Sequence, residues 1–325
     1  MFKNKTILIT GGTGSFGQKF ILKTFKSYNP KKIIVYSRDE MKQWDLSNKF
    51  NYPNLEFVIG DVRDKEGLQR AMNGVDFVVH AAATKIVPTA EYNPFECIKT
   101  NIFGAMNVIN AAIDAKIKKV IALSTDKASN PINLYGATKL ASDKLFISAN
   151  SNKLINKQTI FSVVRYGNVM NSRGSVIPFF QSLKDKTYLP ITHKDMTRFM
   201  ISLDDAVKLV WHAFKNSLGG EIYVKKIPSM KLTEIAKAIS PNSKIKYIGI
   251  RPGEKIHEQM IAKEEADYTY EYADYYKILP QINNWNKDKK RISNGKKVNK
   301  DFSYTSNNNK KWMSIEELQK FLKNA

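Results

Sequence analysis

Cysteine and long apolar runs are nearly absent from this sequence. Its 325 residues contain one cysteine, Cys97, which cannot form an internal disulfide and fits a reducing compartment. No apolar run approaches the roughly 20 residues that a membrane-spanning helix needs. No secretory signal precedes the strand-like segment Thr6–Thr10. These absences predict a cytoplasmic protein without a membrane partner.

Acidic residues are scarce relative to basic ones: 30 Asp and Glu stand against 52 Lys and Arg, and the formal net charge is +22. Such an excess can serve nucleic-acid binding. The lysines are scattered, however, and no basic helix alternates with stacking aromatics, so we expect a solvated surface and no nucleic-acid partner. The positive field would still attract a diphosphate-bearing substrate and cofactor.

Metal-ligand spacing is missing as well. The four histidines do not have the spacing of metal ligands, either among themselves or with Cys97. They are His80, His193, His212 and His257. Neither a P-loop nor a nucleophile elbow is present. We therefore expect no metal centre and look for another kind of chemistry.

Short β-branched runs alternate with helical patterns through the first half of the chain. The expected strands are Thr6–Thr10, Lys32–Ser37, Leu55–Asp61, Val75–Ala82, Lys119–Ser124 and Thr159–Arg165, and a long helical pattern covers Asn93–Lys116. This alternation predicts an α/β fold with a Rossmann-like, doubly wound parallel sheet.

The pattern becomes less regular after Gly167. Expected strands (Tyr188–Thr192, Glu221–Lys225, Lys244–Ile248) mix with expected helices (Ser202–Asn216, Lys231–Ile239, Glu254–Ile261). We predict that residues 1–166 form the dinucleotide-binding domain, to which 195–225 returns, and that 167–194 and 226–280 form a smaller interleaved α/β substrate lobe. Residues 281–325 are expected to form a polar extended tail, in which a capping box at Ser314–Glu317 starts a terminal helix.

A glycine-rich turn follows the first expected strand and opens a helix. Glycines permit the tight turn and let the backbone approach a pyrophosphate, while the helix N-terminus supplies N–H groups and the positive end of its dipole. A plain strand-to-helix turn is the alternative, but the strand–helix–strand context favours a cofactor site. The residues concerned are Gly11, Gly12, Thr13, Gly14, Ser15, Phe16 and Gly17.

The end of the second strand bears on the choice of cofactor. A NAD site usually has an acid there, whereas this chain has Ser37 and Arg38, which suit a 2′-phosphate. The alternative is that Arg38 pairs with Asp39 or Glu40 on the surface. We favour NADP over NAD. Two further pairs belong to the predicted cofactor site: Asp61 and Val62 beside the adenine, and Ala81 and Ala82 at the nicotinamide half.

Two short motifs carry the catalytic prediction. Tyr135 and Lys139 lie four residues apart, on one face of a helix, where the cation should lower the pKa of the phenol. Just upstream, Thr125-Asp126-Lys127 adds a carboxylate and a second amine. A tyrosine base beside a nicotinamide can support hydride transfer, and an added acid and base indicate an elimination. The alternatives are a loop salt bridge and a packed amphipathic helix.

Several stretches, taken in order, resemble the inverting UDP-N-acetylglucosamine 4,6-dehydratases. These extended short-chain dehydrogenases/reductases begin pseudaminic acid synthesis for flagellin glycosylation. Retaining relatives carry glutamate where this chain has Lys127, and that difference indicates the inverting group. The matching stretches are Thr6–Gly17, Tyr36–Glu40, Ile59–Arg63, Leu123–Ala128, Asn133–Leu140, Arg165–Val169, Ser172–Pro178, Met196–Phe199 and Arg251–Lys255.

The resemblance implies a mechanism on UDP-N-acetylglucosamine. Tyr135, assisted by Lys139 and Thr125, would take the C4 hydroxyl proton during oxidation of C4. Neutral Lys127 would remove the C5 proton, and Asp126 would protonate the departing C6 hydroxyl. For this role we expect the pKa of Lys127 to be lowered by partial burial and by the nearby Lys139.

The resemblance also implies binding residues and an assembly. Lys85, Thr100 and Asn101 would contact the cofactor, and Lys85 would also lie near the sugar. A homo-oligomer, such as a hexamer, is expected. Another nucleotide-sugar dehydratase or epimerase, or a non-catalytic NADP-binding protein, remains an alternative. Further substrate contacts would come from Asn168 (diphosphate), Val176, Ile177 and Pro178 (uracil), Arg198 and Arg251 (phosphate, or else surface ion pairs) and Glu254 (ribose).

Overall fold

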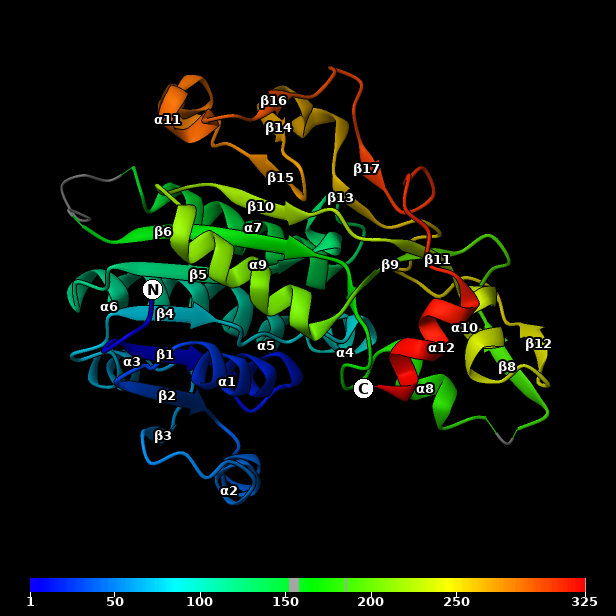
Figure 1. The fold of residues 1–325 in the computed structure, drawn as a ribbon, viewed down its shortest axis with the longest axis horizontal. Coiled ribbons are helices and arrows are strands. Elements are labelled where there is room, and N and C mark those ends of the chain that lie inside the picture. Colours follow the sequence, from blue (N-terminus) through cyan, green and yellow to red (C-terminus); the bar gives the residue numbers. More distant parts are fainter. Residues whose placement is uncertain (152–157, 185, 325) are drawn as a thin grey trace.

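The computed structural model describes residues 1–151, 158–184 and 186–324, and a ten-stranded sheet dominates it (Figure 1). The strands from β10 to β3 are parallel, and the other three are antiparallel. In spatial order they are β16 (Lys296–Lys297), β14 (Thr269–Glu271), β15 (Tyr275–Ile278), β10 (Ile222–Lys225), β6 (Ile160–Tyr166), β5 (Lys119–Thr125), β4 (Phe77–His80), β1 (Thr6–Thr10), β2 (Lys32–Ser37) and β3 (Leu55–Ile59).

Helices cover both faces of this sheet, with α1 and α9 in front of it and α3, α6 and α7 behind it in the view of Figure 1. The first half contributes α1 (Ser15–Ser27), α2 (Glu40–Lys49), α3 (Lys65–Ala71), α4 (Val87–Tyr92), α5 (Pro94–Ile98), the π-helical turn η1 (Lys99–Phe103), α6 (Gly104–Asp114), the 3₁₀ turn η2 (Asp126–Ala128) and α7 (Leu134–Ser148). The second half contributes α9 (Leu203–Asn216), the 3₁₀ turns η3 (Lys263–Tyr268) and η4 (Ile282–Lys287), and α11 (Lys289–Ile292).

Burial on both faces explains why the central strands read as continuous apolar runs. All five residues of β1 are buried. The register places Thr10 opposite Tyr36, so β1 and β2 end close together and the glycine-rich turn starts at their common edge. The predicted Rossmann-like doubly wound fold is confirmed, and both strands have the predicted bounds.

A smaller lobe has its own hydrophobic core, in which Met200, Met230, Leu232, Ile235 and Leu318 are buried. Its sheets pair β7 (Asn168–Val169), β9 (Thr197–Ile201) and β11 (Ser229–Lys231), and separately β8 (Tyr188–Ile191) and β12 (Lys244–Tyr247). Its helices are α8 (Val176–Gln181), α10 (Leu232–Ile239) and the terminal α12 (Ile315–Lys323).

The terminal helix starts at the predicted capping box. Ser314 Oγ accepts a hydrogen bond from the Glu317 backbone N–H at 3.2 Å, and Glu317 Oε2 accepts one from the Ser314 N–H at 2.8 Å. The helix then packs against α10, where Gln319 donates to the Ala238 carbonyl at 3.2 Å (Figure 1). The last helix of the chain therefore completes the core of the smaller lobe.

One predicted helix, Glu254–Ile261, is wrong. The chain turns at Gly253, whose φ is +76°, and enters β13 (Gln259–Ile261), which pairs with β17 (Tyr304–Thr305). Its partner strand lies in the segment that we expected to be a polar extended tail, where Tyr304 and Ser306 are buried. Local periodicity cannot reveal a strand whose partner is so distant in sequence. The predicted bounds of the lobes stay a prediction.

Each helix of the described residues is too short or too polar to cross a bilayer. In the same part of the chain, no cluster of three or more His, Cys, Asp or Glu side chains is arranged to bind a metal ion.

Replacing Leu318 by Ala should lower the apparent free energy of unfolding by about 3 kcal/mol, because a fully buried side chain leaves a cavity in the smaller core. Leu218→Ala is the matched control, since this leucine is 46% exposed. Urea denaturation followed by fluorescence measures both variants. Equal losses in the two variants would contradict the assignment of α12 to this core.

Candidate active site

The carboxyl ends of the parallel strands meet at one edge of the sheet, which is where ligands bind in such folds. The glycine-rich turn follows β1, Ala81 follows β4, and Thr125 ends β5. Most of the predicted cofactor and catalytic residues therefore lie along this edge.

The glycine-rich turn has no room for side chains at two positions. At Gly11, with φ at +67°, a Cβ atom would lie 2.8 Å from the backbone nitrogen of Ala82. At Gly17 it would lie 2.2 Å from the carbonyl oxygen of Gly12. Within the described chain, α1 begins after Gly14 without a side-chain cap, so the amides of its first turn are available to an anion.

The other predicted residues of this turn connect it to the rest of the site. Ser15 Oγ accepts a hydrogen bond from the Arg173 N–H at 3.2 Å. Phe16 stacks on Tyr166 with ring centroids 6.5 Å apart. The Thr13 carbonyl accepts a hydrogen bond from the side chain of Gln18 at 3.0 Å. These contacts join the turn to the loop after β7 and to β6.

At the end of β2, Arg38 lies next to Asp61 rather than pairing with its acidic neighbours. Its Nη1 is 3.6 Å from Asp61 Oδ2, and its side chain is 57% exposed. Burial disfavours the charged form of Asp61, but hydrogen bonds from Arg63 lower its pKa. Ser37 Oγ accepts a hydrogen bond from Gln43 at 3.0 Å. The Arg38 guanidinium is thus accessible at the end where a 2′-phosphate is predicted.

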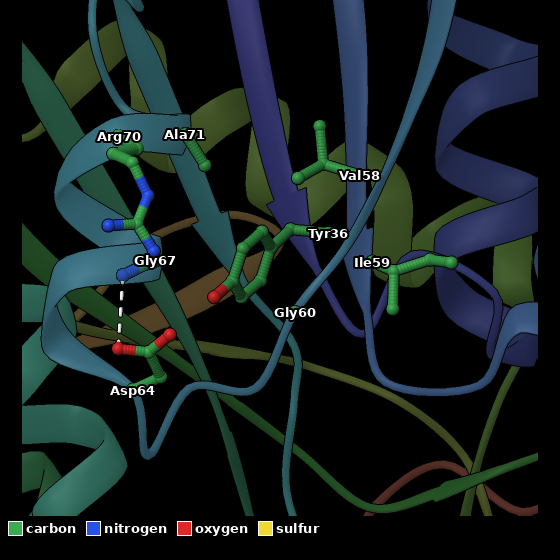
Figure 2. A pocket seen from close by; sticks show the side chains of 8 residues that line it. All are labelled: Tyr36, Val58, Ile59, Gly60, Asp64, Gly67, Arg70 and Ala71. Atoms are coloured by element: carbon green, nitrogen blue, oxygen red, sulfur yellow. Dashed lines mark hydrogen bonds between the residues drawn. The ribbon is translucent and has the colours of Figure 1, made fainter.

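A cavity of about 280 Å³ lies on the α3 side of β3, next to this region. Figure 2 shows the Tyr36 ring across it, with the hydroxyl directed toward α3. That hydroxyl donates to the Asp61 carbonyl at 3.1 Å. The residues that line the cavity are Tyr36, Val58, Ile59, Gly60, Asp64, Gly67, Arg70 and Ala71. The predicted site residues are not among them, so the cavity adjoins the predicted adenine site without being part of it.

The loop after β4 is fixed by Asn101, which the π-helical turn η1 carries. Asn101 Oδ1 accepts from the Thr84 N–H at 2.9 Å, and its Nδ2 donates to the Thr84 carbonyl and to Thr138 Oγ1, each at 3.0 Å. Thr100 is buried beside it. Lys85 Nζ donates to the Arg173 carbonyl at 3.0 Å. Asn101 therefore connects the predicted nicotinamide end of the site to α7.

The acid and amine predicted from the sequence lie in contact at the end of β5. Lys127 Nζ is 3.1 Å from Asp126 Oδ1, and Thr125 Oγ1 donates to the same carboxylate oxygen at 3.0 Å. A second carboxylate, Glu258, reaches the amine from the other side, with Oε1 2.9 Å from Nζ. Arg198 Nε lies 3.6 Å from that Glu258 oxygen. The site is thus a cluster of two carboxylates and two cations.

This cluster overturns the expected pKa of Lys127. Burial alone would lower it, but the carboxylates of Asp126 and Glu258 outweigh burial and raise the pKa above its usual value. Burial also raises the pKa of Asp126, whereas Lys127 and Arg198 outweigh burial at Glu258 and lower its pKa. Lys127 is therefore an ammonium at neutral pH, and the prediction of a lowered pKa is wrong.

Tyr135 and Lys139 lie on α7, whose first turn is capped by Asn133 Oδ1, 2.7 Å from the Gly136 nitrogen. Burial raises the pKa of Tyr135 to about 12, while a hydrogen bond to Thr125 acts in the opposite direction. The predicted lowering of the Tyr135 pKa is therefore wrong for the protein alone. Lys139 is buried, and burial lowers its own pKa.

The predicted substrate residues differ in their burial and in the elements that carry them. Arg198 is 8% exposed and donates to the carbonyls of Thr197 and Ile256, so it is not the surface ion pair considered from the sequence. Arg251 is 62% exposed and pairs with Glu254, Nε to Oε1 at 3.0 Å. The remaining members, Asn168 on β7 and Val176, Ile177 and Pro178 in the first turn of α8, belong to the smaller lobe.

Glu258 is the residue that the sequence did not identify. It lies three residues beyond Lys255, in the segment incorrectly predicted as a helix, and it is 1% exposed. The available signal was the presence of an acid just after the matching stretch Arg251–Lys255. Only the fold places that acid against Lys127.

Comparison with known proteins gives consistent results. The family model described as "Polysaccharide biosynthesis protein" matches residues 7–280. A UDP-N-acetylglucosamine 4,6-dehydratase (inverting) of Campylobacter jejuni subsp. jejuni serotype O:2 is 57% identical, over 98% of this chain and 97% of the relative. A UDP-glucose 4-epimerase of Rickettsia conorii is 44% identical, over 99% of this chain and 96% of the relative.

A solved structure is similar over the whole chain. The X-ray structure of Pen from Bacillus thuringiensis has a TM-score of 0.90 and 37% identity, covering 100% of this chain and 99% of its own. The chain therefore belongs to the polysaccharide biosynthesis protein family, among the extended short-chain dehydrogenases/reductases, and its resemblance to the inverting UDP-N-acetylglucosamine 4,6-dehydratases is confirmed.

Proposed function

We propose that this protein is an inverting UDP-N-acetylglucosamine 4,6-dehydratase, a hydro-lyase that forms UDP-2-acetamido-2,6-dideoxy-β-L-arabino-hex-4-ulose. The observation that best supports this proposal is the ion pair at the end of β5, where Lys127 Nζ lies 3.1 Å from Asp126 Oδ1. It provides an acid and an amine close to Tyr135, as a dehydration after C4 oxidation requires. The 57% identity to the C. jejuni protein over nearly the full length supports the choice of substrate.

The residues along the strand ends fit a dinucleotide. The turn at Gly11 and Gly17 has room for backbone only, and the uncapped first turn of α1 suits a pyrophosphate. The exposed guanidinium of Arg38 suits a 2′-phosphate, so we propose NADP as the cofactor rather than NAD. The other proposed cofactor contacts are those predicted from the sequence, from Thr13 through Asn101.

The first proposed step is removal of the C4 hydroxyl proton by the phenolate form of Tyr135, with Thr125 and Lys139 as its assistants. A bound nicotinamide would supply positive charge beside the phenol and, in its oxidised form, a hydride acceptor for C4, and its reduced form would be the hydride donor for C6, so no net oxidant is consumed. The ketone at C4 acidifies the C5 hydrogen. After Lys127 has removed the C5 hydrogen, the C6 oxygen has left and hydride has returned to C6, Tyr135 returns its proton to C5 from the opposite face, which inverts that carbon.

The elimination step is proposed for the acid–amine pair. Lys127 in its amine form removes the C5 proton, and Asp126 protonates the C6 oxygen, which leaves as water. Since Lys127 is an ammonium at rest, its proton must first pass to Asp126 Oδ1 across their 3.1 Å contact. That single transfer produces the amine and the carboxylic acid together, and the elimination restores the resting charges.

A C4 epimerase is the second candidate, because the R. conorii relative carries that name. An epimerase needs the tyrosine base but gives Asp126 and Lys127 no task at C5 and C6. We favour the dehydratase for this reason. The two reactions differ in one readily measured property, since an epimerised product keeps its 6-hydroxyl.

The wider setting is also a proposal. The product would enter pseudaminic acid synthesis for flagellin glycosylation, in the cytoplasm, and the enzyme would act as a homo-oligomer, such as a hexamer. These proposals rest on the family resemblance, with the full-length similarity to the C. jejuni dehydratase as support.

The reaction should show its mechanism in deuterated buffer. With UDP-N-acetylglucosamine and no added reductant, we expect a product that has lost its 6-hydroxyl and carries deuterium at C5. Lys127→Ala should slow this by roughly 10²-fold or more, because the base is gone. Mass spectrometry and proton NMR measure both changes, with exposed Lys289→Ala as the control. A product that keeps its 6-hydroxyl rejects the dehydratase, and wild-type exchange in Lys127→Ala rejects the assigned base.

Arg38→Ala should weaken NADP binding about tenfold or more and NAD binding much less, because a charged hydrogen-bond donor to the 2′-phosphate is lost. Fluorescence titration with the two reduced cofactors measures the effect. Lys263→Ala is the control, since this exposed cation pairs with Asp301 near the end of the chain and not at the predicted cofactor site. An equal loss for both cofactors would speak against NADP selection by Arg38.

A further inference from the structure

Glu258 is a buried carboxylate for which the mechanism above has no role. Its Oε1 lies 2.9 Å from Lys127 Nζ, closer than Asp126 Oδ1 at 3.1 Å. Its side chain is 2% exposed. Within the described residues, neither Glu258 Oε2 nor Asp126 Oδ2 has a hydrogen-bond partner. Lys127 thus lies between two carboxylates, each of which retains one free oxygen.

The backbone of Glu258 is held on both sides by Ser306. Ser306 Oγ accepts from the Glu258 N–H at 2.9 Å, and the Ser306 N–H donates to the Glu258 carbonyl at 2.8 Å. Ser306 Oγ also lies 2.6 Å from Thr197 Oγ1 on β9. The C-terminal segment therefore fixes Glu258 against the end of β9, and the position of its carboxylate is determined by the fold.

Other charged and titratable groups also face Lys127. Asp126 and Tyr135 come from η2 and α7, and Arg198 comes from β9. Lys255 belongs to the same segment as Glu258, and its Nζ donates to the Ser129 carbonyl at 2.7 Å. Among these groups, Glu258 is the carboxylate that acts on Lys127 from outside the Asp126–Lys127 motif. It favours the protonated form of Lys127, which is also the form reached after the C5 proton is taken.

We propose that Glu258 is a positioning residue for proton transfer: its carboxylate holds the Lys127 nitrogen against Asp126, in place to pass one proton to that carboxylate and to take up the C5 proton. This inference rests on the proposed function. In the balanced cycle, the Lys127 ammonium gives one N–H proton to Asp126 Oδ1, and the resulting amine takes the C5 proton. Asp126 then gives its proton to the leaving C6 oxygen. Glu258 remains a carboxylate throughout and stabilises the ammonium that forms as the C5–H bond breaks.

Replacing the charge while keeping the shape tests this role. In Glu258→Gln, we expect C5 deuterium incorporation to be about tenfold slower in kcat, with KM changed less than about twofold. The rising limb of the kcat–pH profile should move to lower pH by about one unit, because Asp126 must be ionised before it can accept the Lys127 proton, and the charge of Glu258 raises the pKa of Asp126. A purely structural role would slow the reaction without moving that limb.

Two further variants complete the design. Glu258→Asp keeps the charge but shortens the side chain, so we expect slower exchange with the rising limb at its wild-type position. Glu56→Gln is the matched control, since this half-exposed residue pairs with Lys32 at the start of β2, and the candidate active site lies at the other ends of the parallel strands. Thermal melting verifies that each variant is folded.

The outcomes separate the two proposals. Wild-type rate and profile in Glu258→Gln would overturn the role of Glu258, and so would a wild-type rate in Glu258→Asp if the glutamine variant did not fold. An absence of C5 exchange in the wild-type enzyme would instead reject the proposed dehydratase activity itself.

Discussion

Two buried carboxylates share one lysine ammonium in the candidate active site. Opposite charges in contact at low dielectric attract strongly, but each also loses its hydration, so a buried cluster of this kind is tolerable only when it is balanced and well positioned. Asp126 and Glu258 balance Lys127 and Arg198, with separations from 2.9 to 3.6 Å. The reactivity of the site depends on this balance, because it determines which group carries a proton before substrate arrives.

The balance requires contributions from the whole chain. Asp126 and Lys127 follow β5 of the large sheet, Arg198 comes from β9 of the smaller lobe, and Glu258 comes from the segment that leads into β13. Ser306, near the end of the chain, fixes the Glu258 backbone through two hydrogen bonds. Folding of the C-terminal segment is therefore coupled to assembly of this charge cluster, although that segment is polar and its composition suggested little structure.

The parts of this arrangement that sequence could predict are those governed by local rules. β1 and β2 have the predicted bounds because buried parallel strands are apolar and end at glycine or turn residues. The contact between Asp126 and Lys127 follows from their adjacency. Glu258 could not be predicted, because it meets Lys127 only after β13 pairs with β17. The prediction of a lowered Tyr135 pKa was wrong for a related reason. The spacing of Tyr135 and Lys139 indicates a neighbouring cation but does not reveal how deeply the phenol is buried.

The pairing of Lys127 with Glu258 also constrains how the chemistry of such a site can change. The resemblance described above implies that the related retaining dehydratases carry glutamate where this chain has Lys127. A glutamate at this position here would face Asp126 and Glu258 and place three carboxylates around one point. Like charges at contact distance cannot all ionise in a buried site, so at least one would bind a proton and its pKa would rise strongly. In the proposed mechanism, exchange of the base at position 127 alone would thus also disturb the acid, Asp126. Positions 127 and 258 are therefore coupled electrostatically, and this coupling is a property of the packed site rather than of either residue.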